Sequence, residues 1–228
     1  MLSADSMRVR RVFRKSWDLQ PARKDPSQQE SSRGFVTRHN FRFPPVKLEK
    51  VKWTPFQCGE KTYDLSHLHP RTIEYEVAAK SDKPALHFIV DVTYSKHCFS
   101  SDLPKNGNYD PALFYRSRFD PHNRDPRLFD FRRFFLSKQL PDIIATLVRR
   151  KCMHTGHGNF FTVELIEEDG QRVDYDVFFT ASRSSIKGRL NLYVQSAFVR
   201  EKEKLPAGKR IRFEIILYNT LVGKPIRD

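Results

Sequence analysis

Cysteine is scarce in this chain of 228 residues, and its cysteines show no paired spacing. The three, Cys58, Cys98 and Cys152, are widely separated, and no C-x-x-C pair occurs. An odd number of unpaired cysteines argues against a disulfide-stabilised secreted scaffold. We therefore expect a reducing compartment, and the predicted localisation is cytoplasmic.

Long apolar runs and glycine-rich loops are also missing. No apolar run approaches the ~18–20 residues of a membrane-spanning helix, and the basic N-terminus lacks the apolar core of a secretory signal. The sequence has nine glycines and contains neither the G-x-x-x-x-G-K-[ST] nor the G-x-G-x-x-G phosphate loop. We expect no membrane partner, no common type of nucleotide-dependent enzyme, and no cofactor.

Acidic residues are outnumbered by basic ones. The chain has 41 Lys and Arg residues against 27 Asp and Glu residues, which gives a formal net charge of +14 and a pI near 9.8. Such a surplus favours polyanionic partners through electrostatic steering and counterion release, although solubility alone is a simpler explanation. A hydrophobic content of 39%, with 19 phenylalanines, supplies a core and excludes wholesale disorder.

Part of the positive charge lies at the start of the chain. Residues 1–34 predict a flexible arm, because residues 21–34 are polar, contain Pro and Ser and show no periodicity. The candidate contacts of this arm to nucleic acid are its clustered cations, Arg10, Arg11, Arg14 and Lys15. A frayed terminus without a function is the alternative interpretation. Residues 35–228 are expected to form a single domain.

The clearest strand lies within residues 84–101. Its apolar side chains alternate with polar ones and so fall on one face: Leu86, Phe88, Val90, Val92 and Tyr94. Residues 71–79 alternate in the same way. The polar turn between the two segments predicts an antiparallel hairpin.

One segment predicts the main helix. Apolar residues recur at helical spacing over residues 129–151, and Pro141 is tolerated in the first turn of a helix. From residue 159 onward, alternation predicts a β-meander with Asp169-Gly170 at its first hairpin turn. We therefore predict an α+β fold, in which an antiparallel sheet of about six strands carries one main helix on one face.

The polar face of the strand in 84–101 is a candidate wall of an active site. His87 and Asp91 fall on this face, His97 follows the strand, and Tyr94 ends the apolar face. A metal-independent ribonuclease needs an acid, a base and a cation at the phosphate, so these four residues are candidate catalytic groups. A bacterial or phage toxin would be one form of such an enzyme. An ordinary strand at a sheet surface is the alternative.

A second candidate site combines thiol and imidazole groups. Cys152, His154 and His157 lie within six residues, and zinc prefers these donors. The spacing C-x-H-x-x-H is not a standard zinc-finger pattern, so a buried cysteine near ordinary histidines is the favoured interpretation. The three residues stay candidate metal ligands.

A long loop over residues 100–128 interleaves arginine with aspartate and aromatic residues. Its candidate contacts to nucleic acid are Arg116, Arg118, Arg124, Arg127 and Phe119. Arginine beside aromatic rings grips phosphate and stacks on bases. The aspartates slightly favour a second interpretation, in which Arg–Asp pairs fasten the loop to the rest of the domain.

The favoured function is nucleic-acid binding through the arm and the loop, with RNA slightly ahead of DNA. The small ribonuclease is the first alternative. The second is a protein-interaction module, in which Leu113-Phe114 and Leu128-Phe129 fill a hydrophobic pocket of a partner protein. Such pairs more often anchor a loop on its own core. The sequence leaves the oligomeric state open.

Overall fold

The computed structural model describes residues 52–79, 84–118, 122, 124–155, 158–167, 170–201 and 209–226. The predicted arm over residues 1–34, with its four candidate contacts to nucleic acid, lies outside the described residues. Phe119 of the long loop and His157 of the candidate metal site also lie outside them.

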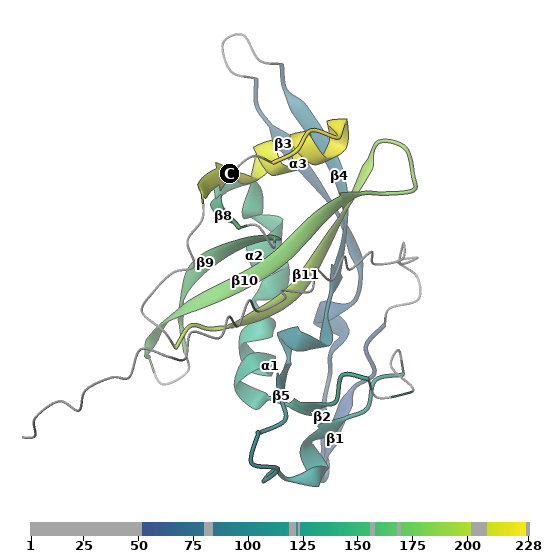
Figure 1. The fold of residues 1–228 in the computed structure, drawn as a ribbon, viewed down its shortest axis with the longest axis vertical. Helices are drawn as coiled ribbons and strands as arrows, with labels where there is room; N and C mark the ends of the chain where they lie inside the picture. Colours follow the sequence, from purple (N-terminus) through teal and green to yellow (C-terminus); the bar gives the residue numbers. More distant parts are fainter. Residues whose placement is uncertain are drawn as a thin grey trace, which may run out of the picture. The chain divides into compact units, whose positions relative to one another are not determined.

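A curled sheet of seven strands forms the centre of the fold (Figure 1). The order across this main sheet is β12-β8-β9-β10-β11-β4-β3. In chain order, the strands are β3 (Arg71–Val77), β4 (Leu86–Tyr94), β8 (Lys151–Thr155), β9 (Gly158–Ile166), β10 (Arg172–Arg183), β11 (Arg189–Val199) and β12 (Lys209–Arg212). Neighbouring strands are antiparallel, except that β4 and β11 run parallel.

Short strands form two smaller sheets. One pairs β1 (Phe56–Cys58) with β2 (Lys61–Tyr63), and Gly59 takes the positive φ of 59° that their tight turn requires. The other has the order β5-β7-β6. Its strands are β5 (Ser100–Asp102), β6 (Phe114–Tyr115) and β7 (Arg127–Phe129). Single 3₁₀ turns are η2 (Ser66–Leu68), η3 (Lys96–Cys98), η4 (Pro111–Leu113) and η5 (Leu147–Arg149).

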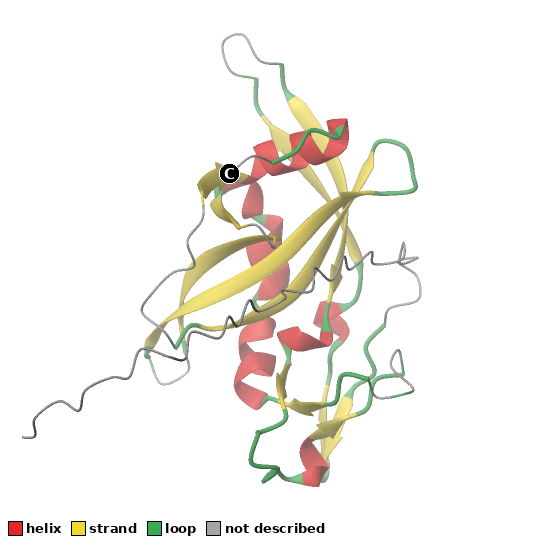
Figure 2. Cartoon of the chain, in the orientation of Figure 1, coloured by secondary structure: helices red, strands yellow, loops and turns green. Residues whose placement is uncertain are grey.

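Three α-helices occur in the described part of the chain: α1 (Phe131–Ser137), α2 (Leu140–Ala145) and α3 (Phe213–Val222) (Figure 2). Asp130 caps the start of α1, because its Oδ1 accepts the backbone N–H of Arg133 at 3.0 Å. Pro141 lies in the first turn of α2, where its missing N–H costs nothing.

One contiguous core joins the helices to one face of the main sheet, which we call the inner face. Val90 and Val92 of β4 pack in this core together with Ile143 and Ile144 of α2. The hydroxyl of Tyr75 on β3 also donates a hydrogen bond to the backbone oxygen of Ile144 at 2.7 Å. The opposite face of the main sheet, which we call the outer face, carries the alternate residues of each strand.

The predicted fold class is wrong in two respects. The main sheet is mixed and has seven strands, and the described residues hold two further sheets and three short helices in place of one main helix. The predicted final strand, over residues 211–217, is the end of β12 followed by α3. The apolar residues there fit both periods, and the helix buries Phe213, Ile216 and Leu217 at helical spacing.

Several local predictions are confirmed. The segment 84–101 contains β4, which pairs antiparallel with β3, and Tyr75 faces Phe88 in this hairpin. β9 and β10 also form an antiparallel hairpin, and Gly170 in its turn has a φ of 82°. The sequence pattern does not predict the strand β8, because the basic residues 149–151 suit the C-terminal end of a helix.

Candidate functional site

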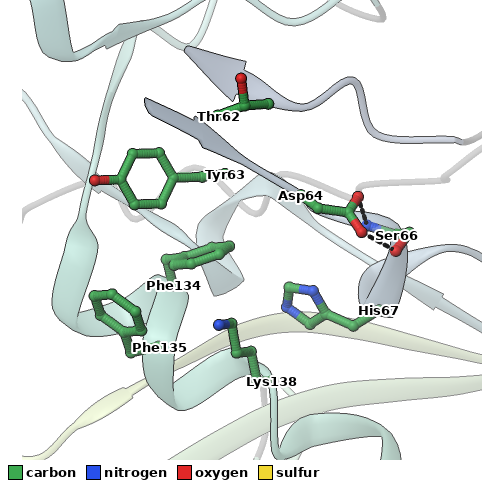
Figure 3. Close-up of a pocket in the computed structure, with 8 residues that line it drawn as sticks. All are labelled: Thr62, Tyr63, Asp64, Ser66, His67, Phe134, Phe135 and Lys138. Atoms are coloured by element: carbon green, nitrogen blue, oxygen red, sulfur yellow. Dashed lines mark hydrogen bonds between the residues drawn. The ribbon is translucent and has the colours of Figure 1, made fainter. Parts of the chain in front are cut away.

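An open pocket of about 510 Å³ lies between η2 and the C-terminal part of α1 (Figure 3). Eight residues line it: Thr62, Tyr63, Asp64, Ser66, His67, Phe134, Phe135 and Lys138. The first five come from the end of β2, from η2 and, in the case of Asp64, from the link between them, and the last three come from α1 and the residue after it. The pocket therefore joins two segments that are about seventy residues apart in the sequence.

A tight turn fixes the acidic side of the pocket. Asp64 Oδ1 accepts the backbone N–H of Ser66 at 2.9 Å, and its Oδ2 accepts the Ser66 hydroxyl at 2.5 Å. These two hydrogen bonds lower the pKa of Asp64, because they stabilise the ionised carboxylate. Asp64 therefore carries a negative charge at neutral pH.

His67 lies at the inner wall of the pocket. Its Nε2 is 2.8 Å from Ser137 Oγ, and Ser137 in turn donates to the backbone oxygen of Phe134 at 2.7 Å. Burial lowers the pKa of His67 to about 4, and Lys138 lowers it further, although Asp64 opposes the shift. The imidazole is therefore neutral at neutral pH.

The cation of the pocket is held by aromatic rings. Lys138 Nζ lies 5.0 Å from the ring centroid of Phe134 and 5.2 Å from that of Phe135. Among the described residues, no carboxylate lies within ion-pair distance of this ammonium. The ring of Phe135 is 43% exposed and forms an apolar wall beside the cation.

The pocket holds a serine, a histidine and an aspartate, but their hydrogen bonds do not make a nucleophilic triad. The exposed hydroxyl of Ser66 is bonded to Asp64, whereas the imidazole of His67 is bonded to Ser137. Ser137 is completely buried and so cannot attack a substrate. The arrangement is that of a binding site with one fixed cation, one fixed carboxylate and aromatic walls.

The four candidate catalytic residues lie along β4 and just beyond it, and the structure does not bring them together. His87 Nε2 pairs with Glu74 Oε2 at 2.9 Å. His87 is four residues before Asp91, which places these two residues about 13 Å apart along the strand. Asp91 is 1% exposed and accepts a hydrogen bond from Thr72 at 2.7 Å. Tyr94 points to the opposite face and is buried in the core.

The fourth candidate, His97, lies in η3 and has a carboxylate partner of its own. Its Nε2 is 2.8 Å from Asp125 Oδ2, and Lys96 Nζ is 3.4 Å from the same oxygen. Burial lowers the pKa of His97, and the positive charge of Arg127 adds to this effect. The hydrogen bond to Asp125 opposes the shift.

The long loop is fastened to the domain by two of its arginines. Arg127 is 3% exposed, and its guanidinium donates to Ser100 and, at 2.6 Å, to Asp102. Arg118 donates to the backbone oxygen of Lys52 at 2.6 Å. The other two candidates for nucleic-acid contacts, Arg116 and Arg124, are exposed.

The described members of the candidate metal site face different partners. Cys152 is completely buried, and burial raises the pKa of its thiol to about 12, so that the thiolate needed for metal binding is disfavoured. His154 Nδ1 is 2.8 Å from Asn159 Oδ1. Within the described residues, no group of three His, Cys, Asp or Glu side chains is arranged to hold a metal ion.

One of the two Leu-Phe pairs is part of the core. Leu128 and Phe129 are buried in β7, and the ring of Phe129 stacks on that of Phe56 with centroids 4.1 Å apart. Leu113 and Phe114 are half-buried.

Sequence reasoning missed the pocket itself. His67 was visible in the segment SHLHP as a loop histidine, but no pattern connected it to Lys138. The two residues meet only because η2 packs against the C-terminal end of α1, which is a tertiary contact without a local signal.

The comparisons with known proteins define a family. The model of the YjaZ family matches residues 55–221, which include all eight pocket residues and most of the main sheet. The chain therefore belongs to the YjaZ family. It is also 32% identical to protein YjaZ of Escherichia coli (strain K12) over 185 residues, which cover 79% of this chain and 97% of that protein. No solved structure matches the chain.

Family membership overturns the function predicted from composition. Nucleic-acid binding, the small ribonuclease and the Leu-Phe interaction module were inferred from charge and loop composition, and neither the family nor its relative gives evidence for them. A basic composition favours polyanions in general, but it does not identify one. Among the described residues, no helix combines the length and the apolarity that crossing a membrane requires.

Proposed function

We propose that this protein binds a small ligand with one carboxylate and an apolar body in the pocket between η2 and α1. The observation that carries this proposal is Lys138, an ammonium held over two phenyl rings at the pocket wall without a described carboxylate partner. A cation in such a position is available to pair with an anionic group of a ligand.

The charges of the pocket favour a singly charged group. Lys138 contributes one positive charge, His67 is neutral, and Asp64 contributes a negative charge on the opposite side. A doubly charged phosphate would bring more negative charge than the pocket balances, whereas a carboxylate pairs with Lys138 alone. The neutral imidazole of His67 adds no charge, and its Nε2 is already bonded to Ser137.

The walls and the size favour an apolar body. Tyr63, Phe134 and Phe135 contribute aromatic surface, and the exposed part of Phe135 is open to a ligand. The volume of about 510 Å³ lies within the range of roughly 300–1,000 Å³ that is usual for small-molecule sites.

Titration calorimetry with phenylacetate and with its neutral isostere phenylacetamide tests this proposal. We expect the full chain to bind phenylacetate more tightly than phenylacetamide. Lys138→Met keeps the apolar stem but removes the charge, so it should weaken phenylacetate binding by roughly tenfold and leave phenylacetamide binding unchanged. Lys105→Met is the matched control, because Lys105 is exposed and does not line the pocket.

Two results would contradict the proposal. One is equal affinity for the two probes in the unmodified chain, which would mean that charge does not contribute. The other is an equal loss of phenylacetate binding in the variants of Lys138 and Lys105, which would mean that only the overall charge of the protein matters.

A further inference from the structure

A second surface, separate from the pocket, lies where α3 meets the turn between β10 and β11 (Figure 1). Gly223 ends α3 with a φ of 73°, and a Cβ built on it would lie 3.3 Å from Arg183 Nη2 at the base of the turn. The C-terminal end of α3 and this turn are therefore in contact. We call them together the α3 surface.

Exposed apolar side chains gather on the α3 surface. Six large hydrophobic residues are exposed in the described part of the chain, and three of them lie here: Ile186 at 55%, Tyr218 at 39% and Val222 at 45%. Tyr218 and Val222 are four residues apart on α3, so they share one side of the helix. Exposed apolar residues that cluster in this way indicate an interaction surface.

Hydrogen bonds hold Ile186 at the tip of its turn. The backbone N–H of Ser184 donates to Arg189 O at 3.1 Å, and the N–H of Arg189 donates to Ile186 O at 3.2 Å. The N–H of Ile186 itself donates to the hydroxyl of Ser184 at 3.2 Å. The exposed isoleucine is therefore presented by an ordered turn.

Basic residues accompany these apolar side chains. Three cations lie at the base of the turn, in the turn and just after α3, and no described carboxylate is within ion-pair distance of them: Arg183, Lys187 and Lys224. Glu214 at the start of α3 is already paired with Arg212 at 3.2 Å. The α3 surface therefore combines apolar tips with an excess of positive charge.

We propose that the α3 surface binds the face of an anionic lipid bilayer. Isoleucine, tyrosine and valine would enter the boundary between headgroups and acyl chains, and the three cations would pair with anionic headgroups. A bilayer fits better than a protein, because the exposed apolar side chains are few and accompany cations without described partners, which suits shallow insertion among anionic headgroups. The expectation of no membrane partner was based on spanning segments, which a peripheral surface does not need.

Flotation of the full chain with vesicles tests the proposal. We expect the protein to float with vesicles of equimolar phosphatidylglycerol and phosphatidylcholine, and to stay unbound with phosphatidylcholine alone. Ile186→Ser should reduce the apparent affinity by roughly tenfold, since an inserted isoleucine loses its apolar burial. Lys187→Gln should reduce it about fivefold, since one cation near the surface is worth about 1 kcal/mol.

Matched controls separate this surface from general charge and apolarity. Ile166→Ser removes an isoleucine that is 62% exposed at the end of β9, and Lys105→Gln removes a cation outside the α3 surface. Both variants should float as the unmodified chain does. No flotation with anionic vesicles, or an equal loss in the controls, would overturn the proposal. So would a vesicle affinity that Ile186→Ser leaves unchanged, because charge alone would then account for the binding and an acidic protein would be an equally good partner.

Discussion

Two trios of Asp, Thr and Arg stand on the outer face of the main sheet, one at each end of β11. Asp176, Thr162 and Arg200 form one trio, and Asp91, Thr72 and Arg189 form the other. In both, the aspartate is on a middle strand, the threonine is on a neighbouring strand, and the arginine is at or just beyond one end of β11. The two trios differ in how firmly the arginine is held.

The trio at Asp176 is closed. Arg200 Nε donates to Asp176 Oδ2 at 2.8 Å, its Nη2 donates to the other carboxylate oxygen, and the same Nη2 donates to Thr162 at 2.6 Å. The side chain of Arg200 is 11% exposed, and a third nitrogen reaches Asp174 at 3.1 Å. The hydrogen bond to Asp176 is the largest cause of the raised pKa of Arg200.

The trio at Asp91 is more open. Arg189 uses one nitrogen, Nη1, which lies 3.2 Å and 3.4 Å from the two oxygens of Asp91. Its side chain is 34% exposed, although Asp91 is as buried as Asp176. The same three residue types therefore neutralise a buried carboxylate in two ways, one by a bidentate pair and the other by a single nitrogen with solvent nearby.

This comparison also bears on Asp91 as a candidate acid or base. A trio of the same composition occurs at Asp176, which sequence reasoning did not select for any chemistry. Burying a carboxylate is costly unless it is paired and hydrogen-bonded, and both aspartates meet that requirement with Thr and Arg. A structural role accounts for both trios, so the position of Asp91 needs no catalytic explanation.

Breaking the closed trio should have the largest effect on stability. Arg200→Ala leaves the buried carboxylate of Asp176 without its cation, and we expect a loss of about 3–5 kcal/mol in the free energy of unfolding. Urea unfolding followed by circular dichroism measures this loss. Arg172→Ala is a suitable control, because among the described residues the side chain of Arg172 makes only an exposed ion pair with Glu164. A loss no larger than that of the control would contradict the idea that the trio is closed.

Breaking the open trio should have a smaller effect. In Arg189→Ala, water can replace the single guanidinium nitrogen while Thr72 still donates to Asp91, so we expect a loss of about 1–2 kcal/mol by the same measurement. Raised salt should reduce the contribution of Arg189 more than that of Arg200, because Arg189 is the more exposed. If Arg189→Ala lowered the free energy of unfolding as much as Arg200→Ala does, the difference in hydrogen-bond geometry between the two trios would not affect stability.

The two trios illustrate what the sequence could and could not predict. Alternation placed Asp91 on the polar face of its strand, because the period of a strand is local information. The partner Arg189 lies 98 residues away, and it meets Asp91 only because β4 and β11 pair in parallel. That pairing was not predicted, since the order of strands across a sheet depends on long-range contacts.

The same reasoning explains which parts of the fold and the pocket were predictable. The β3–β4 and β9–β10 hairpins join segments adjacent in sequence, so alternation and turn residues were enough. The residues of α3 fitted both a helix and a strand, and packing of Phe213, Ile216 and Leu217 decided between them. The pocket needs η2 and α1 together, so neither half was recognisable alone.

The threonines should distinguish the trios least. Thr72 donates to Asp91 at 2.7 Å and Thr162 donates to Asp176 at 2.6 Å, so the two hydrogen bonds are nearly equal in length. Thr72→Val and Thr162→Val should each cost about 1 kcal/mol in urea unfolding. A much larger cost for Thr162→Val would indicate that the closed trio acts as one unit, in which Thr162 also orients Arg200.

The two trios depend on arginines, which are permanently charged, whereas the polar wall of the pocket contains the titratable His67. Acidification should therefore distinguish the pocket from the trios. The pKa of His67 falls from 6.5 to about 4 on folding, so between these values the unfolded chain binds a proton that the folded chain does not. Stability from this source is complete above pH 6.5 and is lost as the pH falls toward 4. His67→Asn should leave the melting temperature almost unchanged at neutral pH and should flatten its decline on acidification.

His97→Asn is the comparison variant, because burial also lowers the pKa of His97. An unchanged decline in His67→Asn would mean that His67 is protonated in the folded protein, and the neutral polar wall assigned to the pocket would then be wrong.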